Sequence, residues 1–196
     1  REPRGPVRWA SWHTRAFAVL GVVAAVSRFA GLHFPTDDGT PVFDEKHYVP
    51  QAWQILRSTG DPISGGIEDN PGFGLVVHPP VAKQVMAIGE WLFGYTPLGW
   101  RFMSAVAGVL VVLAIMDITR RLSGSTLATV VAGVLAIADG VLFVSSRMGM
   151  LDIIQTAFIL GAAWALTVDR DQVARRLAAG PLPLDDDLGS PLPWRW

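Results

Sequence analysis

Four stretches of the chain are apolar over about 20 residues, the length that a helix needs to cross the hydrocarbon core of a bilayer. They lie at residues 14–34, 98–118, 125–144 and 150–168. Each stretch predicts a transmembrane helix. The first stretch lacks a small-residue cleavage site and carries Arg28 towards its far end, so it predicts a retained helix and not a cleaved signal peptide.

The segment between the first two apolar stretches carries a different helical pattern. Apolar residues recur every three or four positions in residues 45–58 and again in residues 81–94. This spacing predicts two short amphipathic helices that lie in the headgroup region of the membrane. Pro79 and Pro80 suit the start of the second helix. The glycine- and proline-rich residues 58–74 predict a loop between the two.

Arginines orient the predicted spans, because positively charged loops stay on the cytoplasmic side. They cluster before the first span, between the second and third, and after the fourth: Arg1, Arg4, Arg8, Arg15, Arg120, Arg121, Arg170, Arg175 and Arg176. Residues 1–13 are therefore predicted to be a cytoplasmic tail, residues 14–168 the transmembrane region with an outer loop at 35–97, and residues 169–196 a cytoplasmic linker. Arg147, in the turn after the third span, then shares the outer side with that loop.

Composition supports a polytopic membrane protein and excludes some other classes. Hydrophobic residues make up 51% of the chain, and cysteine is absent, so neither a disulfide framework nor a thiolate metal site is expected. The 16 lysines and arginines are scattered, which argues against a nucleic-acid surface. The chain begins at Arg1, and its final "PLPWRW" resembles the approach to a further helix. We therefore expect a fragment of a longer polytopic protein.

Two adjacent carboxylates, Asp44 and Glu45 in "FDEKHY", follow the first span by about ten residues. In one interpretation Asp44 caps the following helix and Glu45 complements its dipole. In the other, ionisable groups held at a membrane boundary mark a functional site. A carboxylate there could take a proton from a hydroxyl group as a general base.

Two arginines, Arg28 and Arg147, lie near the outer ends of their predicted spans. Each alone fits a side chain that reaches out of the membrane to water. Together they could hold a phosphate, because guanidinium groups match its oxygen atoms and stay charged. Asp139 and Asp152 flank Arg147 and could pair with it.

A second polar segment, "VVHPPVAKQ", contains His78 and Lys83. Both could add hydrogen-bond donors to the same place, although a single histidine more often caps or packs. The acidic run "LDDDLG" at 184–189 resembles the metal-binding clusters of soluble glycosyltransferases. The charge rule puts it on the opposite side of the membrane from Asp44, so a solvated charge run is the preferred interpretation.

The order "FDEKHY", "VVHPPVAK" and "SSRMGMLD" among hydrophobic spans resembles the protein O-mannosyltransferases, polytopic enzymes of the GT-C glycosyltransferase class. The resemblance runs from about residue 14 to 168, and the form "EDNPGFGLVVHPP" looks like bacterial, actinobacterial-type members. It implies an all-α polytopic membrane protein, GT-C-like, with four transmembrane helices here and amphipathic juxtamembrane helices in the first outer loop. Family members have several more spans, so this chain is expected to be the catalytic N-terminal part.

The resemblance also implies roles for single residues. Asp44 matches the family's catalytic base, and Glu45 matches its acidic partner, which is associated with substrate binding. The positions that match the donor and acceptor region are Arg28, His78, Lys83, Arg147 and Asp152, with the two arginines acting through the donor phosphate and Asp152 as support.

The implied reaction is transfer of mannose from polyprenyl phosphate mannose to Ser/Thr hydroxyls of exported polypeptides, with inversion at C1. It would take place on the outer face of the plasma membrane, with no metal and no cofactor, and secretion machinery is a further expected partner. Two other functions stay open. One is transfer of another polyprenyl-linked sugar, aminoarabinose or arabinose, to lipid or glycan. The other is a transporter subunit, which should place its charges nearer mid-membrane.

Overall fold

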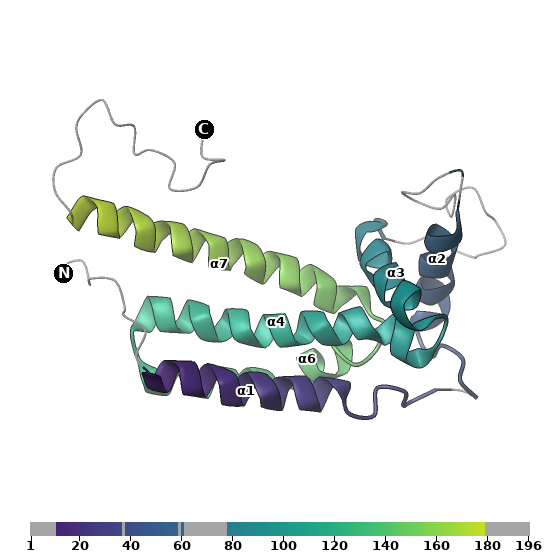
Figure 1. Ribbon diagram of the computed structural model, residues 1–196, viewed down its shortest axis with the longest axis horizontal. Coiled ribbons are helices and arrows are strands. Elements are labelled where there is room, and N and C mark those ends of the chain that lie inside the picture. The colour runs from purple at the N-terminus through teal and green to yellow at the C-terminus, as the bar shows by residue number, and fades with distance from the viewer. Residues whose placement is uncertain (1–10, 37, 59, 61–77, 179–196) are drawn as a thin grey trace.

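The structure is a computed structural model that describes residues 11–36, 38–58, 60 and 78–178. These residues form seven helices: α1 (Ser11–Phe29), α2 (Glu45–Arg57), α3 (Val81–Phe93), α4 (Pro97–Ser123), α5 (Thr126–Ala138), α6 (Gly140–Ser145) and α7 (Leu151–Ala178). Figure 1 shows the three longest helices, α1, α4 and α7, running alongside one another, with α2 and α3 gathered at one end of this bundle.

The four predicted spans differ in how they appear as helices. Within the described residues, α4 and α7 are long and apolar enough to cross a membrane. The helix of the first stretch ends at Phe29, before the predicted end at residue 34. The third stretch is divided at Asp139, whose extended backbone ends α5 and whose carboxylate accepts a hydrogen bond from the Leu142 backbone N–H at 2.8 Å. The predicted third helix is broken there because this carboxylate begins a new helix, α6.

Helices α2 and α3 are present where the apolar spacing predicts them. Pro80 precedes α3, and Gly94, with a φ of 73°, follows its last residue. Pro50 lies in the second turn of α2, and the helix continues through it. A shared apolar core joins these two helices to the beginnings of α4 and α7; its buried members are Tyr48, Val49, Ala52, Met86, Ala87, Trp100 and Leu151.

The contact between α3 and α4 depends on two glycines. A Cβ atom on Gly89 would collide with the carbonyl oxygen of Gly99, and a Cβ atom on Gly99 would collide with the carbonyl oxygen of Gly94. The absence of side chains lets the two backbones approach directly. Helix α3 is therefore held close against the first turn of α4.

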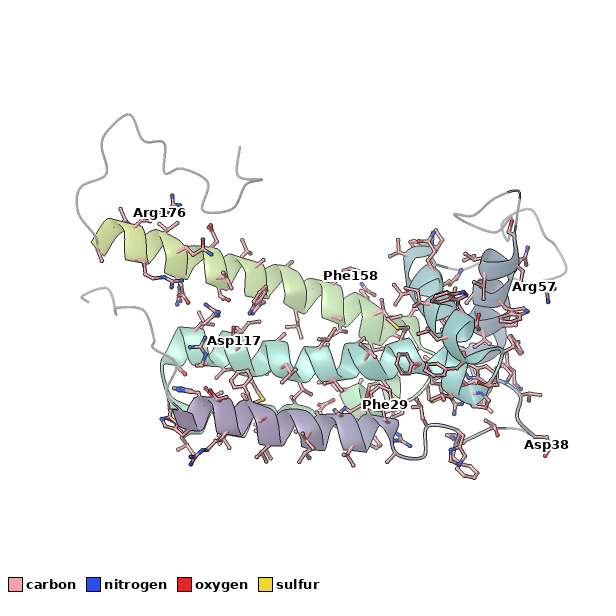
Figure 2. All side chains as sticks on the ribbon, in the orientation of Figure 1. Phe29, Asp38, Arg57, Asp117, Phe158 and Arg176 are labelled. Carbon is pink, nitrogen blue, oxygen red and sulfur yellow. The ribbon has the colours of Figure 1, made fainter. Side chains whose placement is uncertain are left out.

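At the opposite end of the bundle, charged groups join α4 to α7. The Asp117 carboxylate accepts hydrogen bonds from Arg120 at 2.7 Å, Arg121 at 2.6 Å and the Trp164 indole at 2.8 Å. Arg121 also donates to Asp171 on α7 at 3.0 Å. Figure 2 shows Asp117 and Arg176 at this end, away from α2 and α3.

The expected boundaries of the chain's ends are only partly covered. Helix α7 continues to Ala178, so residues 169–178 of the predicted linker are helical, and α1 begins at Ser11 within the expected tail. Residues 1–10, most of the predicted loop at 58–74, and the acidic run at 184–189 lie outside the described residues.

Candidate functional site

A cleft of about 580 Å³ opens where three helices begin. The first residues of α2, α3 and α7 all lie at or next to it, and helix N-termini carry partial positive charge. Its lining residues are Asp44, Tyr48, His78, Pro79, Val81, Ala82, Leu151, Asp152, Ile154, Gln155, Phe158 and Ile159. The cleft therefore joins the "FDEKHY", "HPP" and "MLD" segments, which are far apart in sequence.

One end of the cleft is polar. It carries Asp44, Tyr48, His78 and Asp152, whose side chains have no hydrogen-bond or ion-pair partner in the part of the chain that the structure describes. Asp44 occupies the position before α2, yet its side chain makes no capping hydrogen bond. The capping interpretation of Asp44 is therefore wrong, and its carboxylate is left open to the cleft.

The other end of the cleft is apolar and follows α7. Asp152 and Gln155 are one helical turn apart, and Phe158 and Ile159 follow one turn later on the same face. Phe158 and Ile159 are each 60% exposed. Figure 2 shows Phe158 on the half of α7 that is nearer to α2 and α3. Such a cleft suits an amphiphile that has a polar head and a hydrocarbon chain.

Tyr48 is a cleft residue that the sequence analysis did not single out. Its side chain is 6% exposed, and its ring meets the His78 ring edge-on at 5.9 Å between centroids. Burial raises the pKa of the phenol, and the Asp44 and Asp152 carboxylates raise it further. The phenol therefore stays protonated and available as a donor. Its position one helical turn after Asp44 was the available sequence signal.

Glu45 has an environment unlike that of Asp44. It is fully buried, and its Oε1 accepts hydrogen bonds from Arg101 Nε and from the Gly149 backbone N–H, both at 2.6 Å. Its Oε2 accepts from Arg101 Nη2 at 2.6 Å and from the Val42 backbone N–H at 3.1 Å. Glu45 thus fastens the start of α2 to α4 and to the turn before α7, and its oxygen atoms are occupied by the protein.

Arg101 is a site-forming residue that sequence reasoning missed. Besides Glu45, its guanidinium donates to the carbonyl oxygens of Leu32 at 3.0 Å and Pro35 at 2.7 Å. A lone arginine inside an apolar stretch needs a buried partner, and this was the signal that could have found it. Figure 1 shows α2 and α3 gathered at the end of the bundle where α1 ends and α4 begins, which is the region that Arg101 joins.

The guanidinium groups of Arg28 and Arg147 also donate hydrogen bonds to other parts of the protein. Arg28 is fully buried and donates to the carbonyl oxygens of Ala136 at 3.1 Å and Ile137 at 3.2 Å, near the end of α5. Arg147 donates to four carbonyl oxygens at the end of α1, those of Ser27, Arg28, Ala30 and Gly31, at 2.6–3.2 Å. Both guanidinium groups lie over the Phe143 ring.

Of the remaining predicted residues, Lys83 is buried, whereas His78 and Asp152 are exposed. Lys83 is fully buried and its Nζ donates to the His78 carbonyl oxygen at 3.2 Å, which ties down the segment before α3. His78 itself is exposed and has a φ of 72°. Asp152 is exposed at the start of α7 and faces the cleft; the pairing with Arg147 considered for it is not found.

The predicted groups Asp44, Glu45, Arg28 and Arg147 do not gather around one cavity. Only Asp44 lines the cleft. The other three do not line it: Glu45 is paired with Arg101, and Arg28 and Arg147 donate hydrogen bonds to backbone carbonyl groups. Of the predicted site residues, the cleft brings together Asp44, His78 and Asp152.

A third acidic side chain, Glu90, is buried on α3. Glu90 is 1% exposed, and neither of its carboxylate oxygens has a hydrogen-bond partner among the described residues. Burial raises the pKa of this carboxyl to about 8. Nearby, burial raises the pKa of Tyr95, and Glu90 raises it further.

The arrangement limits the chemistry that the cleft can perform. Within residues 11–36, 38–58, 60 and 78–178, no group of three or more histidine, aspartate or glutamate side chains could hold a metal ion. The open Asp44 carboxylate can accept a proton from a group bound beside it. The cleft therefore combines a proton acceptor with a space for an amphiphilic ligand.

Comparison with known proteins gives consistent matches. The family model described as dolichyl-phosphate-mannose-protein mannosyltransferase matches residues 77–177, just over half of the chain. A polyprenol-phosphate-mannose-protein mannosyltransferase from Corynebacterium glutamicum is 57% identical over 192 residues, which are 96% of this chain and 37% of that protein. Proteins of the same name from Mycolicibacterium smegmatis and Mycobacterium tuberculosis are 57% and 53% identical over 82% and 83% of the chain.

The curated relatives are much longer than this chain. It spans 37% of the length of the Corynebacterium protein and 30–31% of the other two. No solved structure matches the chain significantly.

Proposed function

Because the chain belongs to the dolichyl-phosphate-mannose-protein mannosyltransferase family, we propose that it forms the proton-accepting part of an enzyme that transfers mannose from polyprenyl phosphate mannose to Ser/Thr hydroxyls of exported proteins. The observation that carries this proposal is the Asp44 carboxylate, open and unpaired in a cleft with a polar and an apolar end. The names of the relatives supply the donor and the protein acceptor.

Asp44 is the catalytic base of the proposed reaction. Its carboxylate takes the proton of the acceptor hydroxyl while that oxygen attacks C1 of mannose. The bond between C1 and the phosphate oxygen breaks, and its electron pair leaves with the polyprenyl phosphate. Attack from the face opposite to the leaving group inverts C1, which converts a β-linked donor into an α-mannoside. The donor is already activated, so no cofactor is needed.

The leaving phosphate gains negative charge, and stabilising that charge where it develops lowers the barrier. The converging beginnings of α2, α3 and α7 favour an anion in the cleft, and His78 adds a side chain there. Arg28 and Arg147 serve the reaction as positioning residues, because they hold the ends of α5 and α1 by their carbonyl groups. Lys83 likewise positions His78.

The apolar half of the cleft accommodates the polyprenyl chain. Phe158 and Ile159 extend from the polar end along α7, a helix apolar enough to lie within lipid. A donor that is itself a lipid reaches the cleft from the bilayer, whereas the acceptor polypeptide reaches it from the aqueous side. This division explains why the site stands at the boundary of the membrane.

The proposed topology has four crossings in a plasma membrane, formed by α1, α4, the α5–α6 pair and α7. Arg15, Arg120, Arg121 and Arg170 belong to the end of the bundle opposite to α2 and α3, which favours the cytoplasm for that end. The cleft then faces outward, and α2 and α3 lie in the headgroup region as amphipathic helices.

The proposal is tested with membranes that contain the full-length protein. They receive radiolabelled polyprenyl phosphate mannose and a Ser/Thr-rich peptide, and label on the peptide is measured for the wild type and for Asp44→Asn. Donors that carry arabinose or aminoarabinose in place of mannose are tested in parallel. Transfer of mannose by the wild type alone supports the proposal, whereas equal transfer by the variant removes Asp44 from its role.

A further inference from the structure

One buried polar group of the cleft takes no part in the proton transfer described above. Tyr48 is 6% exposed and lines the cleft, yet its hydroxyl has no hydrogen-bond partner among the described residues. Hydroxyl groups in such environments are nearly always satisfied by protein, water or ligand. A hydroxyl that faces a cavity without a protein partner is therefore available to a ligand group that displaces water.

The position of this hydroxyl is fixed by packing. The Tyr48 ring belongs to the core that joins α2, α3, α4 and α7, together with Val49, Met86 and Leu151. On its other side the ring meets His78 edge-on. A donor held by packing loses little conformational freedom when a ligand binds, which is the property of a preorganised binding group.

The surroundings of the hydroxyl select the kind of ligand group. Asp44, which directly precedes α2, lies one helical turn before Tyr48, and Asp152 lies on α7; both line the cleft, and both act electrostatically on the phenol. Two carboxylates disfavour a third anion at this point. A neutral hydroxyl suits it well, because it can donate to a carboxylate and accept from the phenol.

We propose that Tyr48 is a substrate-binding residue, whose phenolic O–H donates a hydrogen bond to one hydroxyl oxygen of the transferred sugar and so contributes to the choice of hexose. The inference rests on the function proposed above, since it assumes a sugar donor in this cleft. It adds sugar recognition by Tyr48 to the proton acceptor Asp44, which lies at the start of the same helix.

The test compares donors that differ by one hydroxyl. The full-length protein in membranes is given polyprenyl phosphate mannose or a set of analogues that each lack a single sugar hydroxyl, with a Ser/Thr-rich peptide as acceptor. The variant is Tyr48→Phe, which keeps the packed ring. Tyr95→Phe is the matched control, because Tyr95 is the chain's other tyrosine and packs outside the cleft against Trp53 and Trp100.

We expect Tyr48→Phe to lower kcat/KM for the complete mannose donor about tenfold, and Tyr95→Phe to leave it unchanged. The wild type should lose a similar factor with one of the analogues, and Tyr48→Phe should lose nothing further with that analogue. A Tyr48→Phe enzyme as active as the wild type, or one that loses the same factor with every donor, would overturn the inference.

Binding measurements separate this inference from the proposed function. Equilibrium binding of each donor to the purified full-length protein is measured for the same variants. If the wild type binds the donor more tightly than Tyr48→Phe does but transfers no sugar to any peptide, the transferase proposal fails and the binding role stands. If transfer occurs and Tyr48→Phe binds every donor as the wild type does, the binding role fails and the transferase proposal stands.

Discussion

The cleft around Asp44 and the junction around Glu45 are formed by adjacent residues, and they treat polar groups in opposite ways. At the junction every oxygen of Glu45 is taken up by Arg101 or by a backbone N–H. In the cleft the carboxylate of Asp44 has no partner among the described residues. The Glu45 side chain is buried completely, whereas Asp44 is only partly buried.

This difference shows that two adjacent carboxylates can have separate structural and chemical roles. A saturated ion pair in the interior holds helices in one arrangement, because each group would be costly to leave alone. An unsaturated carboxylate beside a cavity keeps its lone pairs for a ligand. The junction therefore fixes where α2 begins, and the beginning of α2 fixes where Asp44 stands.

The largest expected effect is on transfer activity at Asp44. Asp44→Asn keeps the size of the side chain but removes the proton acceptor, so kcat should fall by at least about 100-fold. The unfolding temperature should stay unchanged, because the Asp44 side chain makes no hydrogen bond or ion pair with the described residues. Both are measured on the full-length protein, with Asp38→Asn as the control for an exposed acid outside the cleft. A drop in stability equal to the drop in activity would contradict the division between cleft and junction.

The reverse pattern is expected at the junction. Arg101→Met leaves the Glu45 carboxylate buried without its charged partner, so the free energy of unfolding should fall by about 3–5 kcal/mol. Transfer should be lost together with stability. Thermal unfolding in detergent measures the first, and the peptide assay measures the second. Adding Glu45→Gln to Arg101→Met should restore part of the stability, and a further loss on adding it would argue against a paired junction.

Glu90 combines one property of each carboxylate: it is buried like Glu45, and like Asp44 it has no hydrogen-bond partner among the described residues. Its pKa of about 8 lies above the ordinary value of 4.5, so the folded protein holds this proton more tightly than the unfolded chain does. Its contribution to stability is complete below pH 4.5 and is lost as the pH rises towards 8, at about 1.4 kcal/mol per pH unit.

Glu90→Gln should therefore flatten the pH dependence of stability and make the protein more stable than the wild type near pH 8. The measurement is the unfolding temperature between pH 5 and pH 8, roughly the window in which the two pKa values differ. Asp38→Asn again serves as the control. A variant whose stability still falls across this window would place the titrating group elsewhere.

The smallest effect is expected at Arg147. Arg147→Lys keeps the positive charge but loses the planar fork that reaches four carbonyl oxygens at the end of α1. The free energy of unfolding should fall by about 1–2 kcal/mol, with a modest loss of transfer. The same change at the exposed Arg15 should have no effect. A selective rise in KM for the donor, with stability intact, would instead favour direct contact between Arg147 and the donor phosphate.

Sequence patterns predicted the helices better than the site. Apolar spacing located α2 and α3, and apolar length located α4 and the start of α7, because both patterns are local properties of the chain. The break at Asp139 was missed, since the surrounding residues are uniformly apolar and only the capping hydrogen bond reveals a second helix start. The resemblance to protein O-mannosyltransferases is confirmed by the family match and by the relatives.

Within the site, sequence reasoning found groups of the right chemistry without finding which of them face one another. It selected Asp44, His78 and Asp152, which line the cleft, together with Arg28 and Glu45, which do not. Whether a charged group is exposed or paired depends on residues far away in the sequence. Arg101 lies 56 positions from Glu45, and no local pattern joins them.

Helix α4 carries an ion-pair cluster near each of its ends, one at Arg101 and one at Asp117. At 1.5 Å per residue, the 16 positions between them correspond to about 24 Å, a little less than the roughly 30 Å of a bilayer's hydrocarbon core. The helix thus carries charged residues near both ends and an apolar segment between them. Because Arg101 holds Glu45, the same helix also fixes where the neighbouring Asp44 lies relative to this apolar segment.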